Sequence, residues 1–455
     1  MAEAARREQH YPFTAWNFVV ISIDAAFFFA GLAFMDPVVV LPVLIEKLHG
    51  SQVTIGLMGA IQRAGWIVPQ LLATSFVLHR RRKKPFVLLP VIVSRAPFVP
   101  LAISFYLAPP GSKLQALLGA LIGVYAVFFF CDGLVGVPWH DIIARTIPPN
   151  LRGRFFASIN IGSGIFAIVA GAVVRRVLSD PSLPFPHNYG VLFMFVCGCM
   201  AMSTIALFFI KEPHGSQISD RQSLLTIVRS VPSTLRRYPA LTRLIIAQNM
   251  MGVAAVAIPF YAVYANTRLG LPDSVSGLFI WAGIGGMVIA SLVWAYSNDR
   301  YGPRLVLRGV SLLSIAAPIA AAAIPPLVRA LHAQGDMAYW YAATFFLNSA
   351  AASGGWMGVT NYVFELAPDD IRPLFLGLSA TLSAPVILMP LIGGVLLSFI
   401  SYQALFAIAA VGAAGGTLYV FRLEQPSQLT SHLAYEPAGP ATHGLTYVPE
   451  SPSLD

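Results

Sequence analysis

Long apolar stretches follow one another along most of this chain, and they restrict its fold more than any other feature. Each is close to the roughly 20 residues that a helix needs to cross the hydrocarbon core of a bilayer. Only 11% of the 455 residues are charged and 56% are hydrophobic, whereas soluble domains carry about 25% charged residues. The sequence therefore predicts an all-α polytopic membrane protein.

We predict twelve membrane-spanning helices, arranged as two bundles of six. The first six lie near residues 17–44, 53–77, 86–107, 114–139, 155–177 and 190–210. The second six lie near residues 243–266, 275–297, 305–328, 338–364, 374–398 and 402–421. The remaining parts are an N-terminal tail (1–16), a central loop (211–242) and a C-terminal tail (423–455), which separate or flank the bundles 17–210 and 243–422. We expect the last tail to be disordered, because it has no apolar periodicity.

The positive charges predict the orientation of the chain. Most of its 29 lysines and arginines lie in the predicted tails and turns on one side of the membrane, with basic turns at 79–84, 145–154 and 300–308. Such an excess marks the cytoplasmic side. We therefore expect both termini in the cytoplasm and the protein, as a monomer, in a bacterial inner or plasma membrane. Because the net charge of +9 sets orientation, it does not indicate a nucleic-acid partner.

The chain contains an internal repeat. The stretch His140–Phe156 recurs in altered form at Thr360–Leu376, and Arg80–Lys84 matches Arg300–Arg304 at the same offset. Two matches at one offset indicate a duplicated half.

Twelve spans in two halves joined by a basic loop resemble the major facilitator superfamily. The segment Ala295–Arg304, A-Y-S-N-D-R-Y-G-P-R, is similar to the signature G-x-x-x-D-R-x-G-R-R of that family, with Ala295 and Pro303 as departures. The resemblance covers about residues 15–422. It implies a secondary transporter that moves a small-molecule substrate by alternating access around a site near the middle of the membrane.

Two family motifs for drug/proton antiport are missing. The fourth predicted span, 114–139, has no arginine, and the fifth, 155–177, lacks the pattern G-x-x-x-G-P-x-x-G-G. Drug or metabolite efflux therefore remains an alternative without motif support, beside a sugar or carboxylate symporter. A different class of alternative is a receptor or assembly factor that does not transport.

Four ionisable residues lie near the middle of predicted spans: Asp24, Arg63, Arg95 and Asp132. Each costs at least about 2.5–3.5 kcal/mol to place in a membrane, which makes it a functional candidate. One interpretation is a structural network of two acids and two bases. In the other, Asp24 or Asp132 takes up and releases a proton, because a carboxylate withdrawn from water binds protons more readily. Arg63, with its permanent charge, then contacts an anionic group of the substrate.

The second half offers uncharged candidates for substrate binding. They combine amide and indole groups, which suit an amphipathic organic molecule, but they also suit packing between helices. These residues are Gln248, Asn249, Trp281, Asn348 and Trp356.

The two repeated stretches predict a cytoplasmic gate. In the family the signature loops dock across the halves, which implies Asp299 against Arg152 or Arg154, and Arg80 with its basic neighbours against Glu365, Asp369 and Asp370. The gate also includes Arg300, Gly302 and Arg304 of the signature itself. Single exposed pairs are weak, about 0–1 kcal/mol, but several together bias an equilibrium between two states. The alternative is that these charges only set topology.

The sequence offers no enzyme chemistry. It has no phosphate loop of the form G-x-x-x-x-G-K-[ST], and its three cysteines lie inside predicted spans. We therefore predict neither a cofactor nor a metal site.

Overall fold

The computed structural model describes residues 11, 13–77, 82–109, 114–212, 232, 234–367 and 372–424. Three residues of the predicted gate, Arg80, Asp369 and Asp370, lie outside this part of the chain, as do residues 213–231 and 233 of the predicted central loop and residues 425–455 of the predicted C-terminal tail.

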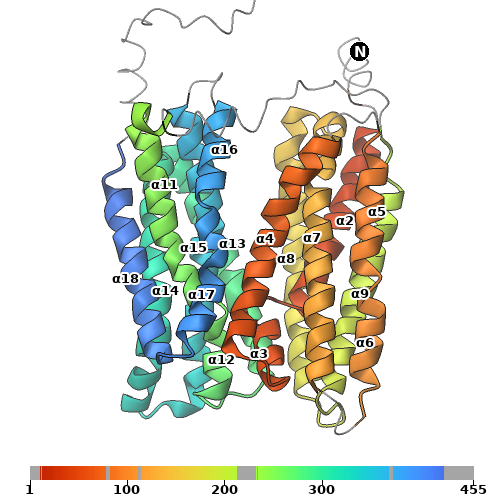
Figure 1. Ribbon diagram of the computed structural model, residues 1–455, viewed down its shortest axis with the longest axis vertical. Helices are drawn as coiled ribbons and strands as arrows, with labels where there is room; N and C mark the ends of the chain where they lie inside the picture. The colour runs from red at the N-terminus through yellow and green to blue at the C-terminus, as the bar shows by residue number, and fades with distance from the viewer. Residues whose placement is uncertain are drawn as a thin grey trace, which may run out of the picture.

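Two bundles of helices stand side by side (Figure 1). The first bundle consists of α2 (Thr14–Phe34), α3 (Val40–Lys47), α4 (Gln52–Val77), α5 (Lys84–Arg95), α6 (Phe98–Tyr106), α7 (Leu114–Thr146), α8 (Pro149–Leu178) and α9 (His187–Phe208). The second consists of α11 (Pro239–Gly252), η1 (Val253–Val256), α12 (Phe260–Thr267), α13 (Val275–Tyr301), α14 (Pro303–Ala330), η2 (Gln334–Asp336), α15 (Met337–Leu366), α16 (Arg372–Leu382), η3 (Ala384–Leu388), α17 (Met389–Leu396) and α18 (Tyr402–Phe421).

The structure confirms the polytopic all-helical fold. Within the described residues, ten helical segments are long and apolar enough to cross a membrane. The predicted spans 53–77 and 338–364 correspond to α4 and α15, which are less apolar and run beside the others (Figure 1). The number of twelve is therefore not confirmed by hydropathy alone.

Several predicted spans are interrupted where a proline lies inside them. The breaks fall near Pro37, Pro97, Pro259 and Pro385, because proline lacks the N–H of a helical hydrogen bond and its ring collides with the preceding turn. At the first break the Asp36 carboxylate accepts two backbone N–H groups at 2.7 and 2.9 Å, which replaces bonds that the broken helix loses.

The long cytoplasmic turn predicted at 145–154 is wrong. α7 continues to Thr146 and α8 begins at Pro149, so only two residues separate them. Likewise Gly302 alone separates α13 from α14. A helix satisfies its own backbone groups in water as well as in lipid, so these helices continue past the apolar residues from which the spans were predicted.

The two halves are joined at the end of the molecule opposite Thr14 and Phe421. There one continuous hydrophobic cluster includes residues of both halves, from α2 and α3 to α12 and α18. At the other end each half has a cluster of its own, and the helices diverge (Figure 1). The structure is therefore closed at one end and separated at the other.

Glycines bring backbones of the two halves into direct contact at the closed end. A Cβ placed on Gly56 of α4 would collide with the carbonyl oxygen of Pro390 in α17, and one on Gly277 of α13 would collide with that of Gly171 in α8. Small residues permit such close approach of helices.

Equivalent basic residues of the repeat make equivalent contacts. Lys84, at the start of α5, donates to the carbonyl oxygens of Phe208 and Ile210 at the end of α9 at 2.7 and 2.9 Å. Arg304, at the start of α14, donates to that of Phe421 at the end of α18 at 3.5 Å. A positive charge at a helix C-terminus is favourable, so both contacts tie the last helix of a half to its third span.

Gly302 adopts φ 80° and ψ 171°, a backbone region that essentially only glycine occupies. We expect Gly302→Ala to lower the free energy of unfolding by about 1–3 kcal/mol, measured as a lower apparent melting temperature in detergent. Gly153→Ala is the control, because Gly153 lies in α8 with open space around it and alanine favours helix. Equal effects of the two substitutions would contradict the assignment of strain to Gly302.

Candidate functional site

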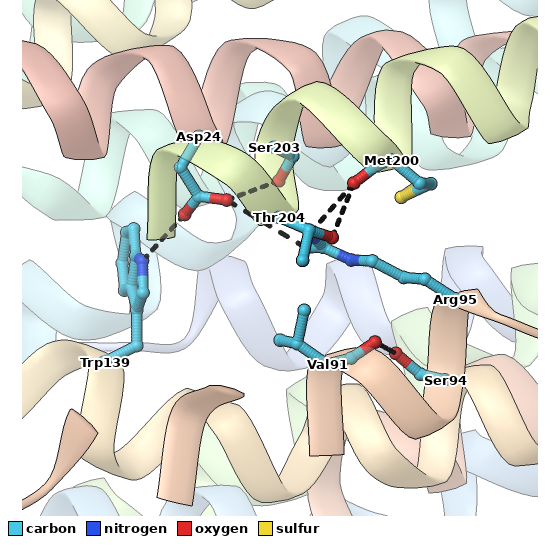
Figure 2. Close-up of polar contacts among 8 residues, drawn as sticks. All are labelled: Asp24, Val91, Ser94, Arg95, Trp139, Met200, Ser203 and Thr204. Atoms are coloured by element: carbon cyan, nitrogen blue, oxygen red, sulfur yellow. Dashed lines mark hydrogen bonds and ion pairs between the residues drawn. The ribbon is translucent and has the colours of Figure 1, made fainter. Parts of the chain in front are cut away.

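Asp24 lies inside the first bundle, where three side chains contact its carboxylate (Figure 2). The Ser203 hydroxyl donates to Oδ1, and Trp139 Nε1 donates to Oδ2 at 3.1 Å. The guanidinium of Arg95 lies 3.9 Å from Oδ1. Asp24 is only 5% exposed, and all these contacts favour its ionised form.

Arg95 is equally enclosed. It donates to Thr204 Oγ1 at 2.7 Å and to the Met200 carbonyl oxygen at 3.2 Å, and its guanidinium lies 5.9 Å from the centre of the Phe28 ring. The network connects α2, α5, α7 and α9 within one half of the molecule. For Asp24 and Arg95 this geometry favours the structural interpretation.

Asp132, in α7, has a different environment. It is half-buried and accepts a hydrogen bond from Trp66 Nε1 of α4 at 2.7 Å. The Trp66 ring packs against Phe129 with 5.5 Å between centroids. Among the described residues Asp132 forms no ion pair, so its charge is less compensated than that of Asp24.

Arg63 lies on the face of α4 that is turned towards the second half. Gly65 defines the face against α7, because a Cβ placed there would lie 2.6 Å from Phe129. Gly59 defines the opposite face, because its Cβ would lie 2.8 Å from Pro390 of α17. Arg63 follows Gly59 by one helical turn and therefore shares its face. The half-buried Arg63 has no ion pair or hydrogen bond within the described part of the chain.

Two of the candidates in the second half hold α11 against the break between α16 and α17. Gln248 Oε1 accepts from the hydroxyls of Ser379 and Ser383 at 2.8 and 3.3 Å. Asn249 donates to the Leu382 carbonyl oxygen at 3.0 Å, whereas its own side-chain oxygen is buried without a partner among the described residues.

The other three candidates differ in exposure. Trp281 lies at the contact between α8 and α13, where its Nε1 donates to the Ile168 carbonyl oxygen at 2.9 Å. Asn348 is half-buried in α15. Trp356 is 80% exposed, on the side of α15 away from Gly354, which packs against α14 and α13. Trp356 and Asn348 are thus better placed to meet a ligand than Trp281.

The gate residues lie at the separated end. Arg152 donates to the carbonyl oxygens of Ala144 and Ile147 at 3.0 and 3.1 Å, which caps the end of α7. Asp299, Arg154 and Glu365 are exposed. Among the described residues, neither Asp299 nor Glu365 forms an ion pair across the halves, so the gate pairs stay a prediction.

Sequence reasoning missed an ion pair that joins the halves at the closed end. Lys47 Nζ, at the end of α3, lies 2.5 Å from Asp273 Oδ2, just before α13. Asn266 Nδ2 donates to the other oxygen of Asp273 at 2.9 Å. Both charges fall in predicted external loops, and no pattern in the sequence connects them.

The family model of the Major Facilitator Superfamily matches residues 23–331 and 244–443. The chain belongs to this superfamily. With ten helical segments able to cross a membrane among the described residues, it is an integral, multi-pass membrane protein. A relative in Mycobacterium tuberculosis, the uncharacterized protein Rv2209, is 24% identical over 272 residues, which cover 58% of this chain and 51% of Rv2209. A Mycobacterium bovis protein, Mb2232, matches with the same values, so the chain spans about half the length of the curated relatives it matches.

Solved structures show the same superfamily fold. A bacterial homologue of the iron transporter ferroportin in its inward-facing state has a TM-score of 0.66 at 13% identity, over 90% of this chain and 98% of that one. The D-xylose-proton symporter has 0.65 at 14% identity, over 91% and 99%. The ferroportin homologue in its outward-facing state has only 0.54 at 13% identity, over 89% and 98%. The arrangement of helices is thus more similar to the inward-facing structure.

We expect Arg95→Gln to lower the free energy of unfolding by about 3–5 kcal/mol, because it leaves the Asp24 carboxylate buried without its cation. Adding Asp24→Asn should restore most of this loss. Arg63→Gln is the matched control and should change stability little, because Arg63 has no partner in the described structure. The measurement is the apparent melting temperature in detergent of the unaltered protein, of the two single variants and of the double variant. Absence of rescue by the second substitution would argue against a structural Asp24–Arg95 pair.

Proposed function

We propose that this superfamily member is a proton-coupled secondary transporter, which moves a small organic solute with an anionic group by alternating access. The observation that carries the proposal is the pair of membrane-embedded charges Asp132 and Arg63, on adjacent helices, neither of which has an ion pair among the described residues. Charges in such positions are costly, and a fold retains them most readily where they serve binding or coupling.

Asp132 is the better candidate for proton coupling than Asp24. Asp24 has a cation and two other donors beside it, all inside one half. Protonation would weaken each of those contacts. Asp132 has the single Trp66 donor and lies on the helix that packs against α4, so a proton can be gained or lost there with less disturbance of the bundle.

Arg63 is the candidate for recognising the substrate's anionic group. A guanidinium cannot lose its charge in a protein, so an anion that pairs with it offsets the cost of placing it there. Trp356 and Asn348 lie in α15 of the other half and supply an exposed ring and a half-buried amide for orientation of the organic part. The affinity for a substrate that contacts both Arg63 and α15 would depend on the distance between the two halves.

The gates at the two ends would open alternately. With the termini in the cytoplasm, as the positive charges predict, the present structure faces inward and the Lys47–Asp273 pair closes the outside. In the outward-facing state that pair separates, while Asp299 meets Arg154 across the cytoplasmic end. Arg152 is then the less suitable partner, because it already caps α7.

We expect Asp132→Asn to abolish the pH dependence of transport and uphill accumulation, while exchange of substrate across the membrane persists, because exchange needs no net proton movement. Asp24→Asn, if it folds, should keep pH-dependent transport. The measurement is flux in proteoliposomes, with a substrate chosen by a thermal-shift screen of organic anions. Full, pH-dependent activity of Asp132→Asn would reject Asp132 as the coupling residue.

We expect Lys47→Ala to favour the outward-facing state by about 1 kcal/mol, the upper range for a partly exposed pair, or about a fivefold change in the ratio of the two conformations. Asp180→Asn is the control, because Asp180 lies in the loop after α8 and, within the described structure, its carboxylate accepts hydrogen bonds from Ser182 of the same loop. Distances between spin labels across the closed end measure the ratio. The exchanged pair Lys47→Asp with Asp273→Lys should recover the original distribution; failure to do so would count against the gate.

A further inference from the structure

A cavity lies at the closed end, away from Arg63 and Asp132 along the helices. It has a volume of about 590 Å³ and is formed by the start of α4, the ends of α12 and α14, and the loop before α18. Its polar and aromatic lining includes Gln52, Tyr264, Arg268, Arg329, Tyr402 and Gln403, beside Ser401.

The charge of this cavity is positive. Neither Arg268 nor Arg329 forms an ion pair within the described part of the chain, and both are exposed to solvent. The guanidinium of Arg268 lies 5.8 Å from the centre of the Tyr402 ring. Contact with the ring does not use the N–H groups at the edge of the guanidinium, so they can donate hydrogen bonds to a ligand. Glu46, the acid whose charge reaches Tyr402, does not line the cavity. Two permanent cations therefore share one opening.

Other groups around the cavity also suit an anion. The long helices α4 and α18 begin at Gln52 and Tyr402, and helix N-termini carry a partial positive charge. The Ser51 and Ser401 hydroxyls accept from the backbone N–H groups of Thr54 and Ala404, so only the earlier N–H groups of each first turn can face a ligand. Gln403 Nε2 donates to the Tyr264 hydroxyl at 3.3 Å. The side-chain oxygen of Gln52 is buried and has no hydrogen-bond partner among the described residues, so it lacks a donor that a ligand can supply.

We propose that this cavity binds a phosphate group that carries a hydroxyl, as in hydrogen phosphate or a phosphate monoester, or one next to the hydroxyls of a lipid headgroup. The phosphate oxygens accept from Arg268 and Arg329, in the planar paired geometry that guanidinium offers. A ligand hydroxyl donates to Gln52. The site is distinct from the proposed transport site, and its occupation does not depend on transport.

The bound phosphate would join the two halves. Gln52 belongs to the first half, whereas both arginines belong to the second. The start of α4 rests on α17, since a Cβ placed on Gly394 would collide with the Gln52 carbonyl oxygen. When the closed end opens, α4 leaves α17 and Gln52 leaves the cavity. A ligand that binds only the closed arrangement shifts the population towards it, so external phosphate would hold the transporter in the present conformation.

Binding is tested on the purified full-length protein in detergent, titrated with inorganic phosphate and with chloride at equal ionic strength. We expect a saturable rise of the apparent melting temperature with phosphate alone. Arg268→Gln and Arg329→Gln should each weaken binding about tenfold, the effect of one charged hydrogen bond. Arg176→Gln, an exposed arginine near the end of α8 outside the cavity, should bind as the unaltered protein does. No specific effect of phosphate, or equal binding by all three variants, would overturn the site for free phosphate.

The source of the phosphate is tested in lipid nanodiscs. If a lipid headgroup fills the cavity, phosphatidylglycerol should raise the melting temperature relative to phosphatidylcholine in the unaltered protein and in Arg176→Gln, but not in the two cavity variants. If free phosphate fills it, the phosphate effect persists in phosphatidylcholine. A protein that responds to neither inorganic phosphate nor phosphatidylglycerol would reject the proposal altogether.

The effect on conformation needs its own measurement. In a cysteine-free background, spin labels at Ala116→Cys and Gln334→Cys report on exposed positions of the two halves at the closed end. Phosphate should increase the fraction of short distances, and Gln52→Leu should remove this increase while keeping part of the binding to the arginines. Binding without any change of the distance distribution would retain the site and refute the link between the halves. Because substrate is absent, these outcomes are independent of the proposed transport.

Discussion

The contact of bare backbones between the two halves determines the conformation of the whole molecule. At Gly56 and Gly277 there is no space for even one additional carbon, because a carbonyl oxygen of the opposite half occupies it. This fixes α4 against α17 and α8 against α13 at one end, where a single hydrophobic cluster crosses from one half to the other. The Lys47–Asp273 pair and the proposed phosphate cavity also join the halves at this end, and in the proposed transport cycle both would be lost when that contact opens. A substitution at either glycine would therefore act on all of them together.

The four embedded charges of the first half differ in what surrounds them. Asp24 and Arg95 satisfy each other and are further bound by Ser203, Trp139 and Thr204, which suits a permanent structural role. In a low-dielectric interior such a satisfied network is rigid, and removing one member leaves an unpaired charge. Arg63 and Asp132 have fewer contacts among the described residues, and this is why we propose that they bind the substrate and the proton. The net charge of the four residues is zero, and this value alone does not distinguish a structural network from a binding site.

Much of the fold was predictable, because the residues that determine it act locally. The apolar runs define the spans, Asp36 and Pro37 break the first of them, and Gly302 turns the chain between α13 and α14. The repeat predicts correctly that Lys84 and Arg304 occupy matching places. The role of Arg152 was less predictable, because its nearest acceptors are carbonyl oxygens that become free only where α7 ends, and the sequence placed that end several residues too early. The partner of Lys47 lies in a loop of the other half and the partners of Asp24 lie in other helices. Their identity follows only from how the helices pack.

One helix, α4, connects the proposed phosphate cavity, the contact between the halves and the proposed substrate site. α4 carries Gln52 at the phosphate cavity, Gly56 and Gly59 at the contact with α17, and Arg63 on the same face one turn further. Since residues on one face of a continuous helix move together, a displacement that frees Gly56 from Pro390 also moves Gln52 out of the cavity and Arg63 relative to α15. An anionic substrate would be held between Arg63 and α15, and a phosphate between Gln52 and the arginines of the second half. Both ligands would therefore influence the same movement of α4, at two positions along its length. Their effects on the equilibrium between conformations would be linked, as binding at two sites must be when both depend on one transition.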